Sequence, residues 1–155
     1  MQICKSHDHR VFKDRRSLEK QLQKKLSSME TIDSLKSKNM SLGYDACEYL
    51  SEIIIERASS PMNLIDLERC FADEDEDMEE QLPMAISTLF DAIEQKGVLR
   101  LNMAWTIVND TIAARIAESF ESLSMLQVLD LSNAMLRTET ATIAQGLQNS
   151  SIRLR

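Results

Sequence analysis

The sequence predicts an α/β protein in which about four short parallel strands alternate with amphipathic helices. Two observations carry this prediction: a leucine pattern near the C-terminus recurs toward the N-terminus, and a segment of helical periodicity follows each copy. At 155 residues with 43% hydrophobic residues, the chain is long enough for one domain around one buried core.

The clearest copy of the repeat begins at Leu126 and reads LQVLDLSNAML. Leucines at alternating positions are typical of a short strand with buried inward side chains, and the spacing matches the pattern L-x-x-L-x-L-x-x-N/C-x-L. A second copy starts about 28 residues earlier, at Val98, with apolar residues at each leucine position. We therefore expect two neighbouring strands with Leu101, Leu129 and Leu131 buried.

Two weaker copies precede these. One starts at Met62 and has Cys70 where the pattern accepts Asn or Cys. We interpret Cys70 as a small buried group on the turn after the strand, the alternative being a redox or metal role. The other starts at Ile32 and is followed by Gly43, which is suited to a turn with positive φ.

Helical periodicity fills the intervals between the copies. The expected helices are Asp45–Glu56, Pro83–Gln95, Asp110–Phe120 and, more weakly, Thr138–Leu147. Pro83 suits the first turn of its helix, where a missing N–H is no loss, and Gly97 suits a left-handed cap at the end of the same helix.

The ends of the chain differ in character from the repeats. Residues 1–15 are expected to be a flexible basic arm, and 16–155 the repeat domain, opened by a capping helix over Arg16–Leu26. Ile152 and Leu154 resemble the start of another strand, so we expect a repeat array truncated at its C-terminus.

Charge and composition exclude several classes of function. The net charge of −7 argues against nucleic-acid binding, which needs clustered Lys and Arg. The sequence has neither an apolar run of about 20 residues nor a signal peptide, so we expect an intracellular protein that is not secreted and does not bind membranes. Cys4, His7 and His9 lack a second cluster to complete a metal site. No metal, cofactor or self-contained active site is expected.

These units match leucine-rich repeats of the ribonuclease-inhibitor-like type, a right-handed solenoid with parallel strands on its concave face and helices on its convex face. Over residues 16–148 the chain resembles the N-terminal repeats of Ran GTPase-activating proteins. Three segments carry the resemblance: IDSLKSKNMSLGYDACEYLSEII, LIDLERCFADEDEDMEEQLPMAISTLFDAI and LQVLDLSNAML.

The resemblance implies a protein partner, namely a Ran-type small GTPase with bound GTP, and a location in the cytoplasm or at the nuclear envelope. It also implies that Asn133, on the loop after a strand, helps to position the catalytic glutamine of the GTPase. Asn133 can equally be read as a turn residue. The family has an Arg a few residues after the Phe of the second unit, whereas this chain has Phe71-Ala72-Asp73-Glu74, whose carboxylates would repel phosphates. The alternative function is a non-catalytic scaffold for protein–protein interaction.

Four residues occupy the same position of successive units and are expected to form a partner-binding row: Asn39, Arg69, Trp105 and Asn133. For Trp105, packing in the core and a binding hot spot remain alternatives.

An acidic patch falls in a predicted loop insertion over residues 72–81. It comprises Asp73, Glu74, Asp75, Glu76, Asp77, Glu79 and Glu80. A solvated loop at a helix N-terminus, a contact with a basic partner and a cation site are the three interpretations left open.

Overall fold

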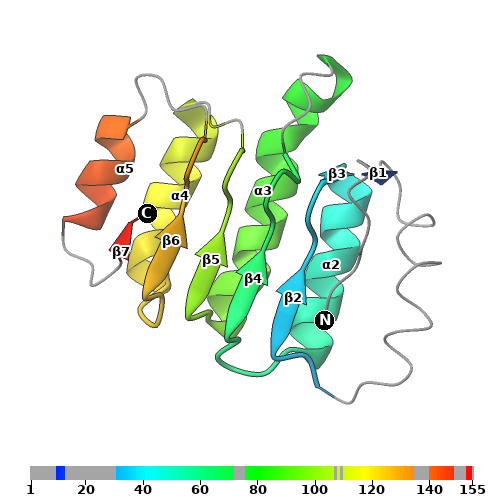
Figure 1. Cartoon of the computed structure of the whole chain (residues 1–155), viewed down its shortest axis with the longest axis horizontal. Helices are drawn as coiled ribbons and strands as arrows, with labels where there is room; N and C mark the ends of the chain where they lie inside the picture. The colour runs from blue at the N-terminus through cyan, green and yellow to red at the C-terminus, as the bar shows by residue number, and fades with distance from the viewer. Residues whose placement is uncertain are drawn as a thin grey trace.

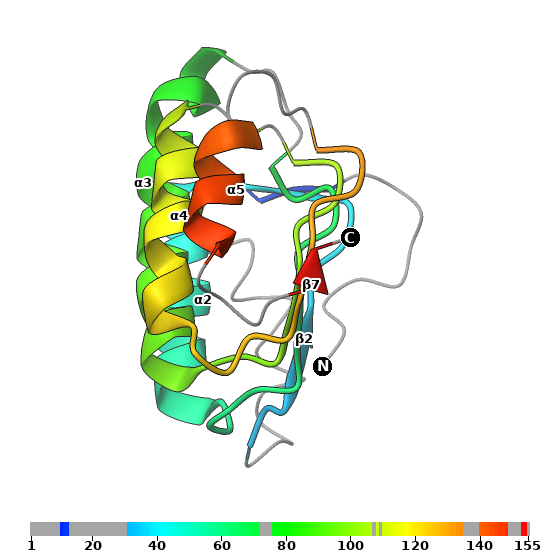
Figure 2. The same ribbon diagram turned by 90° about the vertical axis from the view of Figure 1, so that its left-hand side faces the viewer.

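The structure, a computed structural model, describes residues 10–12, 31–71, 76–106, 108, 110–134, 140–148 and 153–154. Within them, five short strands form one parallel sheet, and helices cover one face of that sheet (Figure 1, Figure 2). The strands, in both sheet order and chain order, are β2 (Ser34–Lys36), β4 (Leu64–Asp66), β5 (Arg100–Asn102), β6 (Val128–Asp130) and β7 (Arg153–Leu154). The helices are α2 (Tyr44–Arg57), α3 (Glu76–Lys96), α4 (Asp110–Ser122) and α5 (Thr140–Leu147).

The sheet is in register at the central residue of each strand. Leu35 pairs with Ile65, Ile65 with Leu101, and Leu101 with Leu129. All four side chains are buried, as are Met103 and Leu131 just beyond the strands. The predicted strand register is therefore confirmed, and each such side chain contributes about 1.5–3 kcal/mol by leaving water.

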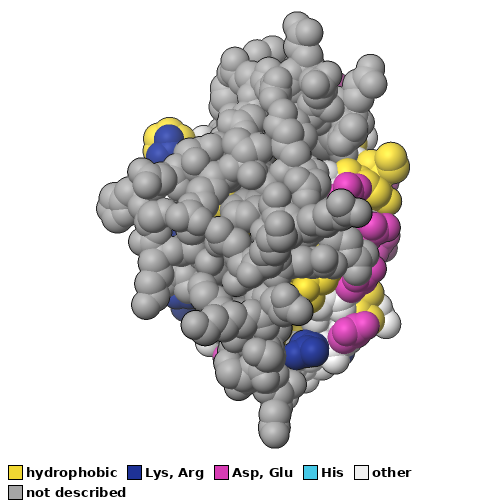
Figure 3. Space-filling model, turned by 90° about the vertical axis from the view of Figure 1, so that its right-hand side faces the viewer, with side chains coloured by type: hydrophobic (Ala, Val, Ile, Leu, Met, Phe, Trp, Pro, Cys, Tyr) yellow, Lys and Arg dark blue, Asp and Glu magenta, His cyan; other side chains and the backbone are white. Residues whose placement is uncertain are grey.

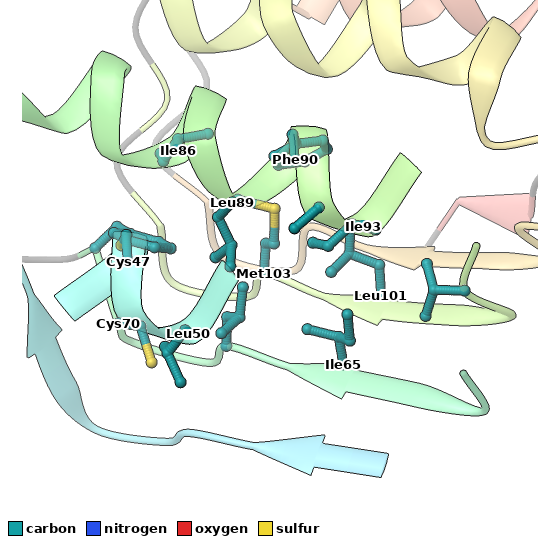
Figure 4. Close-up of a cluster of buried hydrophobic side chains, with 14 of the residues drawn as sticks. Cys47, Leu50, Ile65, Cys70, Ile86, Leu89, Phe90, Ile93, Leu101 and Met103 are labelled. Atoms are coloured by element: carbon teal, nitrogen blue, oxygen red, sulfur yellow. The ribbon is translucent and has the colours of Figure 1, made fainter. Parts of the chain in front are cut away.

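The core lies between the sheet and the helices. Figure 4 shows Leu89 and Ile93 of α3 facing Ile65 and Leu101 of the strands, all of them buried. This packing explains the predicted helical periodicity, because apolar residues repeated every 3.6 positions form one stripe along each helix, and that stripe faces the sheet.

The residues with positive φ are only partly those that the sequence predicts. Gly97 has φ +75° and its N–H donates to Ile93 O at 2.8 Å, so the predicted left-handed cap of α3 is confirmed. Gly43 is instead extended, with φ −78° and ψ 177°. The left-handed residue of that unit is Asn39, with φ 54°.

The start of α3 also corrects the sequence reading. The helix begins at Glu76, so Pro83 lies inside it and not in its first turn, and the predicted acidic loop 72–81 is helical from Glu76 onward. Glu and Gln are good helix formers, and carboxylates near a helix N-terminus interact favourably with its dipole. Those preferences outweigh the one backbone hydrogen bond that proline cannot donate.

At the N-terminal side, β1 (Arg10–Phe12) pairs in parallel with β3 (Met40–Leu42). The expected basic arm thus contains a short strand, while its other residues and the expected capping helix Arg16–Leu26 lie outside the described residues. In the part of the chain that is described, no helix has the length and apolar character needed to cross a membrane.

Candidate functional site

The four residues predicted to share one position do so in the structure. Asn39, Arg69, Trp105 and Asn133 each lie three residues after the end of a strand, on the turn that leaves the sheet, and we call them the turn row. Their φ angles are 54°, 56°, 61° and 55°, and they are the non-glycine residues with positive φ in the described part of the chain. The repeat therefore extends to the backbone conformation of the turns.

Backbone hydrogen bonds join these turns to one another. The N–H groups of Asn39, Arg69 and Trp105 donate to Glu68 O, Ala104 O and Ser132 O, each at 3.0 Å. Every donor belongs to one turn and every acceptor to the next, so the turn row is held as a continuous line across the array. Its side chains are presented on a rigid frame and not on independent loops.

A second row of polar side chains, at the last residue of β4, β5 and β6, braces this frame. Asn102 Oδ1 and Asp130 Oδ1 each accept the N–H of the residue two positions later, at 2.9 Å, and Asp66 Oδ1 accepts that of Glu68 at 3.4 Å. The Asn102 amide also donates to Asp66 Oδ1 at 2.9 Å. Our sequence reasoning did not identify this row. The available signal was an Asp or Asn directly after the central apolar residue in three of the four copies.

Lys38 neutralises the acidic end of the frame. Its ammonium lies 2.6 Å from Glu68 Oε2 and 3.1 Å from Asp66 Oδ2. The hydrogen bond to Glu68, followed by the contacts with Asp66, raises the pKa of Lys38 above its ordinary value of 10.5 despite partial burial. Asp66 is itself buried, so this pairing compensates part of its desolvation.

The middle of the turn row carries its most exposed apolar group. Trp105 is 46% exposed, which excludes the core-packing alternative. The Arg69 guanidinium lies over the Trp105 ring, 5.1 Å from its centroid, an arrangement typical of a cation–π interaction. A stacked guanidinium keeps the N–H donors at its edge available to a partner.

Asn133 lies at the C-terminal end of the row. Its side chain is exposed and has no hydrogen-bond partner within the part of the chain that is described. Other groups make the hydrogen bonds of this turn. The Ala134 N–H donates to Leu131 O at 3.0 Å, and the Ser132 N–H donates to the Asp130 carboxylate. The amide of Asn133 is therefore available to a partner.

The buried cysteines offer no reactive centre. Burial raises the pKa of Cys47 above its ordinary range and that of Cys70 to about 12. The Cys70 thiol donates to Ser37 O, which matches the structural role predicted from the repeat. Cys4 lies outside the described residues. Among those described, no group of three His, Cys, Asp or Glu side chains is arranged to hold a metal ion.

The acidic patch lies partly in α3. Asp73, Glu74 and Asp75 lie outside the described residues, and Glu76, Asp77, Glu79 and Glu80 belong to the first turns of α3. The patch and the turn row are thus parts of different elements.

Comparison with known proteins adds no assignment: no protein-family model and no curated protein matches the sequence.

Proposed function

We propose that this chain is a right-handed leucine-rich-repeat solenoid that binds another protein along the turn row. The in-register strands, the helices on one face and the four equivalent turns support the repeat assignment. Such arrays present their turns and strand face as an extended binding surface, with the strands on the concave side.

The observation that carries the proposal is the residue type at the two central turns. A left-handed backbone costs an ordinary L-residue about 1–2 kcal/mol, whereas Asn tolerates it. Asn39 and Asn133 follow this preference, but Arg69 and Trp105 do not, and both are exposed. What these two side chains gain in the packing is one exposed cation–π contact with each other, worth about 0.5–1 kcal/mol, which is less than the strain of two left-handed residues. Strained backbone at exposed Arg and Trp is typical of a site where binding, not folding, selects the residue.

For the partner we propose a Ran-type small GTPase with bound GTP, with Asn133 positioning the catalytic glutamine of that GTPase. The exposed amide of Asn133, at the end of the row and without a hydrogen-bond partner among the described residues, supports this role. The chain would then act as a GTPase activator without an active site of its own.

A non-catalytic scaffold is the second candidate, and one observation favours it. The carboxylates of Asp66, Glu68 and Asp130 lie beside the turn row, where Lys38 pairs with Asp66 and Glu68. Negative charge close to the phosphates of a nucleotide would oppose hydrolysis. In that case the surface binds a protein without stimulating any reaction.

Single-turnover hydrolysis of GTP by a Ran-type GTPase, with and without this protein, tests the proposal together with a binding titration. Arg69→Asn and Trp105→Asn should each weaken binding by at least about 2 kcal/mol, roughly thirtyfold. Met84→Ala, which truncates an apolar side chain 56% exposed on α3, is the matched control and should leave affinity unchanged.

Asn133→Ala separates the two candidates. In an activator it should reduce stimulated hydrolysis more than affinity, because a positioning group acts mainly in the transition state. Binding without stimulation would identify a scaffold. Equal affinity of the wild type and both turn variants would contradict the binding role of the row.

A further inference from the structure

We propose that the strand face recognises an acidic segment of the partner. Lys36, Arg69 and Arg100 would receive its carboxylates, and Trp105 would contact an apolar side chain beside them. This inference rests on the proposed function, because it names the chemistry of the partner that the turn row binds.

The first argument is that these three cations have no ion-pair partner among the described residues. No ion pair joins Lys36, Arg69 or Arg100 to a carboxylate within the described residues. The other cations nearby behave differently. Lys38 pairs with Glu68 and Asp66, and Arg115, between α3 and α4, lies 2.6 Å from carboxylate oxygens of both Asp91 and Glu94.

The second argument is the uneven distribution of charge over the two faces. The described helices carry most of the carboxylates: Asp45, Glu48, Glu52 and Glu56 on α2, Asp91 and Glu94 on α3, and Asp110, Glu118 and Glu121 on α4. Figure 3, a view from the α2 end, shows acidic side chains along the helix side. Most of the described carboxylates thus lie behind the sheet. Asp66 and Asp130 share the front with the cations, and Lys38 pairs with Asp66 there.

The third argument is spacing. Lys36 and Arg100 alternate with the buried residues Leu35 and Leu101, so both point away from the helices. They belong to β2 and β5, which are separated by β4 alone, and Arg100 lies two residues before the register position of Lys36, so their backbones are about 12 Å apart. An extended chain covers that distance in about four residues. Arg69 lies in the turn after the intervening strand, so one short segment can reach all three cations.

Carboxylates suit this set better than nucleic-acid phosphates do. Arg69 stacked on Trp105 leaves a planar guanidinium edge of the kind that binds a carboxylate with two hydrogen bonds. Three cations neutralise few phosphates, so this set would supply little of the electrostatic affinity that nucleic-acid binding requires.

Selection of peptides from a random display library on the immobilised full-length chain tests the inference without a known partner. We expect enrichment of Asp or Glu next to an aromatic or aliphatic residue. Affinities of the selected peptides, measured by fluorescence anisotropy, should fall about tenfold or more for the double variant Arg69→Gln/Arg100→Gln. The charge-matched control, Arg57→Gln/Lys96→Gln on the helix side, should bind within about twofold of the wild type. Thermal melts should establish that both double variants are folded.

Selected peptides that are neutral or basic, or acidic peptides that bind both double variants equally, would overturn the inference. In that case the effect of Trp105→Asn separates the two proposals. If this variant abolishes peptide binding, the turn row still binds a partner and only the acidic-segment inference fails. If it leaves peptide binding unchanged, the proposed function fails as well. A single-stranded DNA oligonucleotide that binds more tightly than the peptides and depends on the same arginines would also overturn it. A large gain in peptide affinity from Asp73→Asn/Glu74→Gln/Asp75→Asn would overturn it as well, because this chain's own acidic run would then be the segment that binds the strand face.

Discussion

The four turns of the row share one backbone conformation but differ in what they present. The outer turns hold Asn39 and Asn133, whose side chains are suited to a left-handed backbone. The inner turns hold Arg69 and Trp105, which gain nothing from that conformation and instead stack on one another in solvent. The comparison separates two causes of residue choice: the left-handed backbone explains the outer pair, and we propose partner binding as the cause for the inner pair.

The largest expected effect tests whether the buried side chains next to an outer turn and an inner turn contribute equally to stability. Leu131→Ala and Met103→Ala remove equivalent buried side chains below Asn133 and Trp105. Each should lower the free energy of unfolding by about 2–5 kcal/mol in a urea titration, the usual cost of a large-to-small change in a core. A cost under about 1 kcal/mol at either site would mean that its strand register is wrong.

Much of this frame was predictable from sequence because it follows from spacing. Alternating apolar residues placed Leu101 and Leu129 in the core, and a common position in each repeat placed Arg69 and Trp105 in one row. The start of α3 at Glu76 was not predictable from the same signals, because Pro83 indicated the first turn of a helix and the acidic run before it indicated a loop, although Glu and Gln favour a helix there.

The bracing of the site was also missed, for a different reason. A hydrogen bond such as that from the Asn102 amide to Asp66 joins residues 36 positions apart and depends on sheet register. Local pattern reasoning gives the face of each residue but not its partner across strands. The same limit hid the pairing of Lys38 with Glu68, which crosses from one repeat to the next.

A smaller effect of opposite sign is expected at the exposed positions themselves. Trp105→Asn should raise the free energy of unfolding by about 0.5–1 kcal/mol, because relief of left-handed strain exceeds the loss of one exposed cation–π contact. Asn133→Ala should lower it by about 1 kcal/mol, since alanine does not tolerate that backbone. Thermal denaturation of the two variants beside the wild type measures both. If Trp105→Asn were destabilising, a contribution to folding stability would account for Trp105, and the difference between inner and outer turns would no longer support a binding role.

The smallest effect concerns the ion pair between Lys38 and Glu68, which links an outer turn to an inner turn. Lys38, beside Asn39, bonds Glu68, beside Arg69, whereas the corresponding residues of the next two turns are Ala104 and Ser132. Lys38→Met should lower the free energy of unfolding by about 0.5 kcal/mol near neutral pH, because the pair is partly exposed and screened.

The pH dependence of that difference identifies its origin. Because folding raises the pKa of Lys38, the contribution of the ammonium is fully present below its ordinary value of 10.5 and is lost as the pH rises through the higher folded value. The difference between wild type and Lys38→Met should therefore disappear in strongly alkaline solution. Subtracting the variant from the wild type at each pH removes the parallel effect of the buried thiols, since both proteins retain Cys47 and Cys70. A difference that persists when the ammonium is deprotonated would assign the role of Lys38 to packing of its aliphatic chain and remove the electrostatic link between the two kinds of turn.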